Sequence, residues 1–490
     1  MPSGKEGASR PAVVYPAPAR WLTALAFVGP GVVWAAEAIG SGELILSTRL
    51  GTAFGLMLLW VPTWAVILKN LGPGYLHGRW ATVFGEGAMD MYARIPPKRL
   101  WPAIFGILHI LAGAMSIGGL AASVGVVVYT LAGKYGPLPA YTAGVYALTL
   151  VIALLGIYTL LEVIFMGMMA SMVILTVVLA AIAAPSIAEI IQGTFAVGYV
   201  TAPAEWATVR APGIEPVALD PLVSILPVLA WAAGGSASHI WYSYWVVGSK
   251  IFGMARYGEW GKPGNVEKYR EFADEDWKNM RWWVRTQILD AVLACVLTVL
   301  IIDAFFIAGY KILAPRRLLP GGVKLAEVLG EMYTAYLGPR ALLFVLVGSF
   351  FILWSTNISQ TVGWPIIIMD GIRYIYPRIT EKVSTQTLRR VITVLLGLWS
   401  VAWALGYATA PVELITWASI FDGALLVVLQ GILSVVAWTY VAPRELSKVM
   451  PKEKARELIP RVPIVINIIC TILFAYFTVW WAGRALGLIR

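Results

Sequence analysis

Apolar residues run in long, nearly unbroken stretches along almost the whole chain, and polar residues are collected between them. Each stretch is close to the roughly 20 residues that a helix needs to cross the hydrocarbon layer, and longer than the alternating stretches of about 10 residues that form barrel strands. Because lipid offers the backbone no hydrogen-bond partner, helices are the remaining way to cross it. The pattern predicts an all-α integral membrane protein with about 11 transmembrane helices. Their expected ranges are 22–48, 52–70, 101–131, 138–158, 160–184, 222–248, 284–310, 341–368, 391–408, 412–440 and 462–484.

The composition excludes several classes of protein. Of the 490 residues, 59% are hydrophobic and 13% are charged, and the mean hydropathy is +0.76, which is not the composition of a soluble domain. The two cysteines each stand alone in an apolar stretch, so neither a disulfide framework nor a zinc site is expected. No Walker A, H-E-x-x-H or nucleophile-elbow motif is present. The chain is therefore predicted not to be an enzyme and to need no cofactor.

The basic residues are distributed unevenly between the two sides of the membrane. The net charge is +10, and of the 37 Lys and Arg residues, 27 fall on the side of the N-terminus and 10 on the other. Cytoplasmic loops carry this excess in membrane proteins, so the charge does not indicate a nucleic-acid partner. The distribution predicts a cytoplasmic N-terminus and an outside C-terminus in the cell's inner or plasma membrane.

The spans suggest a division into two halves of five helices followed by one more. The expected parts are a disordered cytoplasmic tail at 1–20, a first repeat at 21–184, an extracytoplasmic loop at 185–221, a second repeat at 222–440, and a loop with helix 11 at 441–490. The most polar internal segment lies between the sixth and seventh spans, and it includes the sequence GKPGN at 261–265. We interpret this segment as a cytoplasmic loop.

Two spans contain glycine-rich, polar interruptions near their centres. The first carries Ile39-Gly40-Ser41-Gly42-Glu43, and the sixth carries Gly234-Gly235-Ser236-Ala237-Ser238-His239. Glycine favours non-helical backbone, and freed backbone groups at this depth are tolerated only against protein or a water-lined cavity. Each interruption also has an ionisable side chain, which is expensive in lipid and therefore functional more often than not. Broken helices at corresponding positions of two halves are the signature of an inverted-repeat secondary transporter.

These residues resemble the Nramp (natural resistance-associated macrophage protein) family of proton-coupled divalent metal transporters. The similarity is carried by Gly29–Gly31, Gly51–Gly55, Leu58–Val61, Leu161-Glu162, Met369–Gly371, and Arg389-Arg390 with Thr393. It covers most of the chain, from the first span to the ninth. The resemblance implies the LeuT-type fold, a 5+5 inverted repeat with broken helices 1 and 6.

The residues of the implied metal site differ from the family's. Where the family has DPGN in the first break, with Asp and Asn binding the metal, this chain has Gly40 and Glu43. Where the family has MPH, whose thioether is a soft ligand, this chain has Ser236, Ala237 and Ser238, with His239 following. The family's proton-associated histidine one turn later aligns with Ser243, and the third span has no acidic residue.

The remaining polar residues of the breaks and of the tenth span form the candidate site. Loss of the thioether and gain of carboxylate favour hard cations such as Mg²⁺ or Mn²⁺ over Fe²⁺ or Cd²⁺. The candidate metal ligands are Glu37, Glu43, Ser236 and His239. The candidate substrate-binding residues are Gly40, Ser41, Gly42, Glu43, Gly235, Ser236, Ser238, His239 and Asp422.

A second reading of the same residues stays open. Ile39-Gly40-Ser41-Gly42 is similar to the first break of the amino-acid/polyamine/organocation superfamily, where backbone N–H groups hold a substrate carboxylate. Against it, Glu43 occupies the helix N-terminus and could satisfy these donors from within the chain. The predicted function is therefore secondary transport of a divalent metal cation, with an amino acid or another small organic solute as the alternative. The expected partners are the lipid bilayer and this small cation or solute, and the sequence predicts no oligomeric state.

Other polar residues in the spans have simpler interpretations. His77 and His109 lie far from both breaks in the sequence and are expected to be loop and packing residues. Asp290 and Asp303 in the seventh span lie on different faces of the helix and are expected to have structural pairing roles. Asn357, Ser359 and Gln360 in the eighth span either line the path or join helices.

Overall fold

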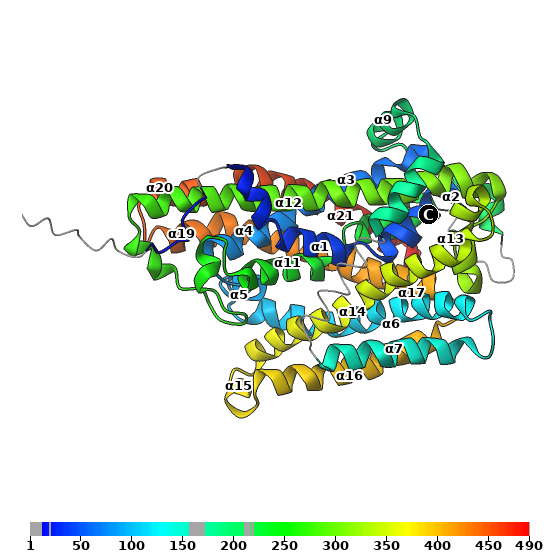
Figure 1. The fold of residues 1–490 in the computed structure, drawn as a ribbon. Helices are drawn as coiled ribbons and strands as arrows, with labels where there is room; N and C mark the ends of the chain where they lie inside the picture. The colour runs from blue at the N-terminus through cyan, green and yellow to red at the C-terminus, as the bar shows by residue number, and fades with distance from the viewer. Residues whose placement is uncertain (1–11, 19–20, 156–171, 210–216, 218–219, 490) are drawn as a thin grey trace, which may run out of the picture.

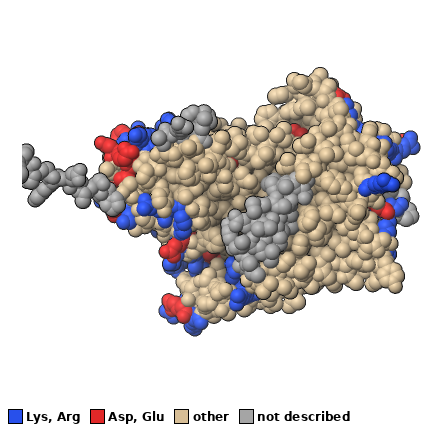
Figure 2. All heavy atoms as spheres, in the orientation of Figure 1, with Lys and Arg blue, Asp and Glu red and all other residues tan. Residues whose placement is uncertain are grey.

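The computed structural model describes residues 12–18, 21–155, 172–209, 217 and 220–489. Within these residues all regular secondary structure is helical, which confirms the all-α prediction. Nine helical segments of the described chain are long and apolar enough to cross a membrane, and a bent pair, Met172–Ala183 with Ile187–Phe195, makes a possible tenth. Charged side chains gather at the two ends of the bundle in the view of Figure 2, and its middle is almost free of them. The chain is an all-α integral membrane protein.

The first span is divided, so neither of its parts is long enough to be counted among the nine. Helix α1 (Pro30–Ala38) ends at the predicted break, and the chain resumes as a π-helical turn (Gly42–Ser47) that continues into α2 (Thr48–Phe54). The predicted boundary between the first and second spans, near residue 50, is therefore wrong. The chain turns at Gly55, whose φ of +81° favours glycine.

The second span is longer than predicted and extends over Leu56–Phe84. It comprises α3 (Trp60–Lys69), a π-helical turn with a kink (Asn70–Gly74) and α4 (Tyr75–Phe84). The sequence NLGPG at this kink has the composition of a loop, which explains the predicted end at residue 70. The segment stays within the bundle because Gly72 lies against the backbone of Asn467 and Gly74 against the ring of Trp34. This extension places Lys69, at the predicted end of the span, in the interior.

The remaining helices follow in two groups. Figure 1 shows α6 (Leu100–Leu131), α7 (Leu138–Leu155), α14 (Ala341–Ile375) and α16 (Thr385–Gly406) together along one side. Helices α1, α3, α4, α11 (Ser236–Ser249) and α12 (Asp274–Ala308) lie along the other. Within the first group α6 and α14 pack so closely at Gly106 and Gly371 that a Cβ on either would overlap the other's Cα.

The sixth span is broken as predicted. Helix α10 (Pro221–Trp231) ends at a non-helical segment, and α11 begins at Ser236. The tenth span is a third irregular helix, with α17 (Pro411–Ala418), a π-helical turn (Ser419–Leu425) and α18 (Leu426–Val436). The chain then passes through α19 (Ala442–Leu446) and α20 (Lys452–Leu458) into the final span, α21 (Arg461–Ala485).

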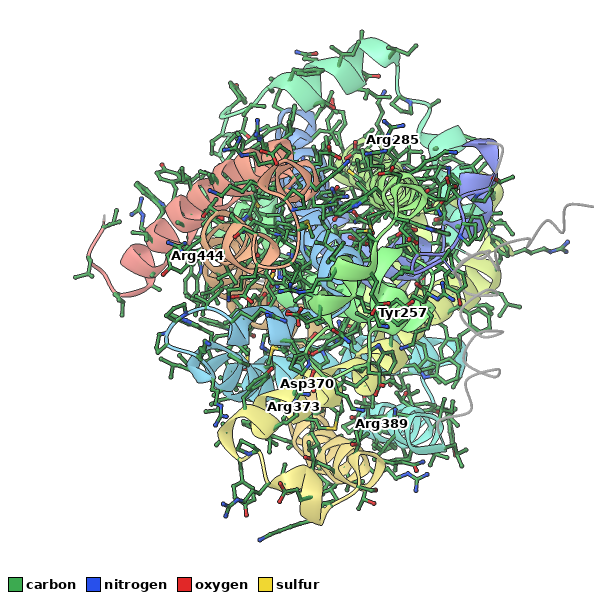
Figure 3. The ribbon with its side chains drawn as sticks, turned by 90° about the vertical axis from the view of Figure 1, so that its left-hand side faces the viewer. Tyr257, Arg285, Asp370, Arg373, Arg389 and Arg444 are labelled. Carbon is green, nitrogen blue, oxygen red and sulfur yellow. The ribbon has the colours of Figure 1, made fainter. Side chains whose placement is uncertain are left out.

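One end of the bundle, which we call the inner end, carries α5 (Ala88–Ala93), α19 and α20. Figure 3 looks onto this end, with Asp370 and Arg373 of α14 near its middle. Part of the predicted disordered tail is ordered here. Asp276 accepts hydrogen bonds from the backbone of Val13 (2.8 Å) and Val14 (3.1 Å), and the Trp283 indole donates to the carbonyl of Tyr15. The charge distribution predicts that this end is cytoplasmic.

Candidate functional site

The two broken helices meet through the side chain of Glu43. Its carboxylate accepts one hydrogen bond from the backbone N–H of Gly40 (2.9 Å) in its own break and one from Ala233 (3.0 Å) in the other. The side chain is completely buried. Gly42 allows this approach, because a Cβ there would overlap the carbonyl of Trp231. Glu43 thus accepts from one buried backbone donor in each break.

The second break has unusual backbone geometry. Ala233 and Gly234 both have left-handed φ values, +62° and +72°, which cost a residue with a Cβ about 1–2 kcal/mol. Lys69, completely buried, donates to the carbonyls of Ala230 (2.8 Å) and Gly234 (2.6 Å) on either side. The Glu43 carboxylate therefore accepts a hydrogen bond from one N–H of this break, and the Lys69 ammonium group donates to two carbonyls beside it. Lys69 is not among the predicted site residues, because it lies at the predicted end of the second span.

Asp422 faces the second break from the π-helical turn of the tenth span. Its carboxylate accepts a hydrogen bond from the Ser236 hydroxyl (2.7 Å) and lies so close to Gly235 that a Cβ there would overlap it. His109 on α6 also reaches this point, with Nε2 3.1 Å from the Ser236 hydroxyl and 3.8 Å from the Asp422 carboxylate. The interpretation of His109 as a packing residue remote from the breaks is corrected by these contacts.

His239 is positioned by a glutamine. Its Nδ1 lies 2.6 Å from the side-chain oxygen of Gln430 on α18, and the Gln430 amide donates to the carbonyl of Ser236 (3.0 Å). The Nε2 atom of His239 is buried without a hydrogen-bond partner. His77 lies beside His239, with ring centroids 6.4 Å apart, and its Nε2 is 2.6 Å from the Tyr92 hydroxyl. His77 is therefore inside α4 and not in a loop as predicted.

A small cavity lies between the two breaks, α14 and the tenth span. It leaves about 10 Å³ for the centre of a water-sized sphere, which is on the order of one water molecule or one ion. Glu37 of α1 lines it, and the Oε2 atom of this buried carboxylate has no hydrogen-bond partner. The other polar residues of its lining are Ser41, Ser238, Thr356, Gln360 and Asp422.

The structure distributes the four predicted metal ligands over different partners. Glu43 is bonded to backbone, Ser236 to Asp422 and His239 to Gln430, whereas Glu37 lines the cavity. Among the described residues no group of three or more His, Cys, Asp and Glu side chains is arranged to hold a metal ion. Of the substrate-binding candidates, the cavity lining includes Ser41, Gly42, Gly235, Ser238 and Asp422.

The polar residues of the eighth span divide into two roles. Gln360 and Thr356 line the cavity, and Gln360 also accepts a hydrogen bond from Ser116 on α6 (2.6 Å). Asn357 donates to the carbonyl of Ile117 and joins α14 to α6. Asp290 accepts from Tyr242 (2.9 Å) and Asp303 from Thr63 (2.9 Å), which agrees with the structural pairing predicted for both.

Comparisons with known proteins bear on the fold. No family model matches the chain. An uncharacterized protein of Pasteurella multocida is 23% identical over 383 residues, 77% of this chain and 78% of that protein. The manganese transporter of Eremococcus coleocola, in complex with an aromatic bis-isothiourea substituted compound, is similar over 97% of this chain and 96% of its own, with 16% identity and a TM-score of 0.64. The chain has the LeuT-type fold. Mhp1 is similar over 93% of this chain and 91% of its own, with 16% identity and a TM-score of 0.48.

The LeuT-type fold gives the interrupted helices their place in the architecture. The pair α1 and α2 is the broken helix 1 of the first repeat, and the pair α10 and α11 is the broken helix 6 of the second. In a 5+5 inverted repeat these two helices meet near the middle of the bilayer. The cavity between Glu37 and Asp422 lies at this meeting point.

Proposed function

We propose that this protein is a secondary transporter, divergent from but related to the Nramp family, that moves a hard divalent cation such as Mn²⁺ or Mg²⁺ by alternating access. The observation that carries the proposal is the pair of buried carboxylates, Glu37 and Asp422, in one ion-sized cavity between two broken helices. Buried charges are costly unless they are paired or bind an ion, and Glu37 Oε2 has no protein partner. A cation in the cavity would supply one.

The lining favours hard cations over soft ones. Its polar side chains offer carboxylate, hydroxyl and amide oxygens, and neither methionine nor cysteine is among the lining residues. Oxygen ligands suit Mg²⁺ and Mn²⁺, whereas thioether and thiolate suit softer metals. The similarity to a protein described as a manganese transporter also supports a hard cation as the substrate.

The organic-solute alternative is disfavoured by two observations. Two backbone N–H groups of the breaks that could hold a substrate carboxylate, those of Gly40 and Ala233, already donate to Glu43. The cavity is also of the size of one water molecule, far below the roughly 300–1,000 Å³ of pockets that enclose drug-sized organic ligands.

Metal binding tests this function directly. In calorimetry on purified protein, Mn²⁺ or Mg²⁺ should bind at least as tightly as Cd²⁺, and Glu37→Gln and Asp422→Asn should each weaken binding by about tenfold or more, since each removes a charged ligand. Glu413→Gln, at an exposed position of α17, is the control and should bind like the parent. Binding of Cd²⁺ without Mn²⁺ or Mg²⁺ would contradict a hard-ligand site. Stabilisation by an amino acid with no metal binding would favour the alternative.

Protons are expected to compete with the metal rather than to accompany it. Helix α6 carries no acidic residue, and Ser243, at the position of the family's proton-associated histidine, donates to the carbonyl of Ile240. A carboxylate must release its proton before it binds metal, so acidic buffer should weaken metal binding. We expect metal influx into proteoliposomes to leave the lumenal pH nearly unchanged when an entrapped pH-sensitive dye is read. Metal-dependent acidification that disappears in Glu37→Gln would show that coupling is retained.

A further inference from the structure

Lys69 is a buried ammonium group in the interior of a membrane protein. It is the last residue of α3, immediately before the π-helical kink, and its side chain is completely buried. A charge at this depth is expensive and is normally paired or bound by backbone carbonyls. Here its Nζ donates to the carbonyls of Ala230 and Gly234, at 2.8 and 2.6 Å.

These carbonyls belong to the C-terminal end of a half-helix. Helix α10 ends at Trp231, so the carbonyl of Ala230 is one of the acceptors that a helix end leaves free, and Gly234 lies in the unwound segment. The helix dipole adds partial negative charge at this end. Half-helix C-termini and unwound carbonyls are the groups that bind monovalent cations in transporters with broken helices. The Phe474 ring, whose centroid lies 5.8 Å from Nζ, contributes a further surface suited to a cation.

The carbonyl cradle adjoins the carboxylate-lined cavity through Gly234, which is among the residues that line the cavity. Lys69 is not among them, and neither Ala230 nor Phe474 is. Its side chain enters from α3, whereas the cavity is formed by the breaks, α14 and the tenth span. The two places therefore present different chemistry, neutral carbonyls in one and carboxylates in the other.

We infer that the carbonyls of Ala230 and Gly234 form a monovalent-cation site whose resident cation is Lys69. The tethered ammonium takes the place of a free Na⁺ or K⁺ at the end of α10. The second break therefore keeps its conformation without a bound monovalent ion. The stability and the transport activity of the protein do not depend on Na⁺ or K⁺. Removal of the side chain exposes a cradle that accepts a small free cation.

The test is the thermal stability of Lys69→Ala in detergent, without divalent metal, as NaCl or KCl replaces choline chloride at constant ionic strength. In choline the Tm of the variant should be lower than that of the parent. In Na⁺ or K⁺ the Tm of the variant should rise by a few degrees, because a ligand stabilises the state that binds it. The parent and Lys69→Arg, which keeps a tethered cation, should show no such dependence. Equal Tm values in all three salts for folded Lys69→Ala would overturn the inference.

Chemical rescue provides a second measurement if Lys69→Ala is too unstable to purify in choline. Membranes that contain the variant are solubilised with Na⁺, K⁺ or n-propylammonium, and the monodisperse fraction is measured by size exclusion. Recovery in at least one of these cations but not in choline supports the cradle, and no recovery in any of them overturns it. Neither readout involves divalent metal, so failure of the proposed metal transport would leave this result unaffected, and the reverse also holds.

Discussion

Glu43→Ala should lose thermal stability as well as transport. The substitution leaves the N–H groups of Gly40 and Ala233 buried without acceptors. A hydrogen bond to a charged group contributes about 1.5–3 kcal/mol, so the loss of both should cost about 3–6 kcal/mol. The second break should be destabilised more than the first, because Ala233 has a left-handed backbone conformation that its own side chain disfavours.

Glu43→Gln separates a structural role from a ligand role. The amide keeps one oxygen acceptor, but its NH₂ group must face the other N–H, so we expect a smaller loss of Tm, about half that of Glu43→Ala. Glu37→Gln should give the opposite pattern, weaker metal binding with little loss of Tm, because Glu37 Oε2 has no hydrogen bond to lose. Both quantities are measured on the same purified samples, Tm by thermal shift and affinity by calorimetry.

The comparison of these two variants tests where the proposed metal ion binds. If Glu43→Gln keeps the parent's Tm and loses metal binding, Glu43 is a metal ligand, and its hydrogen bonds to the two breaks contribute little to stability. If Glu37→Gln binds metal like the parent, the cavity is not the metal site. Glu413→Gln, exposed on the outer part of α17, controls for removal of one negative charge.

The positions of the breaks could be predicted because their cause is local. Glycines and polar side chains within an apolar run weaken the helix at that place, whatever it packs against. The LeuT-type fold and the two broken helices followed from these local features and from the resemblance. Span boundaries were less accurate where local composition misleads, as at Asn70–Gly74, whose kink is stabilised by contacts with Trp34 and Asn467.

The partners of the site residues could not be predicted, because they are distant in the sequence. Glu43 accepts from a backbone N–H 190 residues away, and Lys69 donates to carbonyls more than 160 residues away. His109 meets Ser236 only because α6 crosses the start of α11. The pattern identified the ionisable side chains of the breaks, but the roles of Glu43, Lys69 and His109 depend on helix packing.

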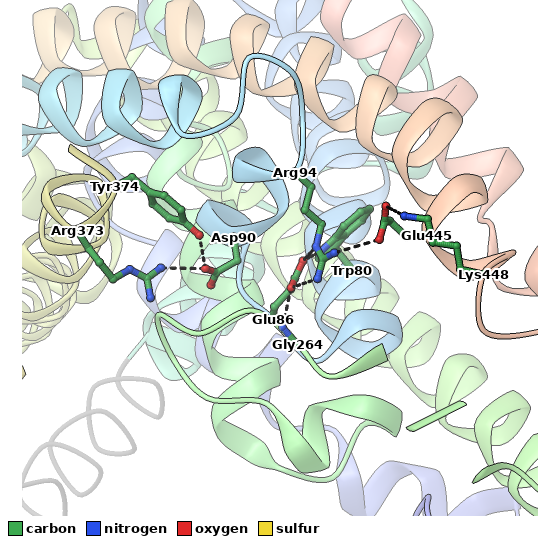
Figure 4. A network of polar contacts seen from close by, with 9 residues as sticks. All are labelled: Trp80, Glu86, Asp90, Arg94, Gly264, Arg373, Tyr374, Glu445 and Lys448. Atoms are coloured by element: carbon green, nitrogen blue, oxygen red, sulfur yellow. Dashed lines mark hydrogen bonds and ion pairs between the residues drawn. The ribbon is translucent and has the colours of Figure 1, made fainter. Parts of the chain in front are cut away.

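Glu86→Gln should open the inner end of the helix bundle. Glu86 is completely buried and accepts from the indole of Trp80 (2.9 Å), from Arg94 (2.6 and 2.8 Å) and from the backbone of Gly264 (2.7 Å) (Figure 4). This one carboxylate therefore joins the segment after α4 to the loop between the sixth and seventh spans. Arg94 extends the network to Glu445 on α19 at 3.6 Å.

A second ion pair at the same end joins α5 to α14. Asp90 accepts from Arg373 (2.8 Å) and from the Tyr374 hydroxyl (2.6 Å). The Tyr244 hydroxyl on α11 donates to Asp370, one turn before Arg373. The inner half of broken helix 6 is thereby tied to the group of helices that contains α14. These contacts join the two groups of helices at the inner end, and the groups would have to separate there in the alternating access proposed above.

Breaking a buried pair by removing one partner costs about 3–5 kcal/mol, and Glu86→Gln keeps part of the geometry but loses the charge. If only the state with the inner end closed makes these contacts, a differential loss of about 3 kcal/mol shifts the balance of states roughly 150-fold. Gly264→Ala is an independent second variant, because a Cβ at Gly264 would overlap the carbonyl of Phe84 and displace the loop from Glu86. Both variants should favour the state that is open at the inner end.

The measurement is thiol labelling of Ser238→Cys, which lines the cavity, after the buried Cys295 and Cys470 are replaced by Ser. In inside-out vesicles, which expose the predicted cytoplasmic face, a membrane-impermeant reagent should react at least about tenfold faster when Glu86→Gln or Gly264→Ala is added, since each tenfold corresponds to about 1.4 kcal/mol. Glu267→Gln, whose exposed carboxylate pairs with Arg270 in the same loop, should leave the rate unchanged. An unchanged rate in Glu86→Gln, with a lowered Tm, would mean that the network stabilises the fold in every state and does not act as a gate.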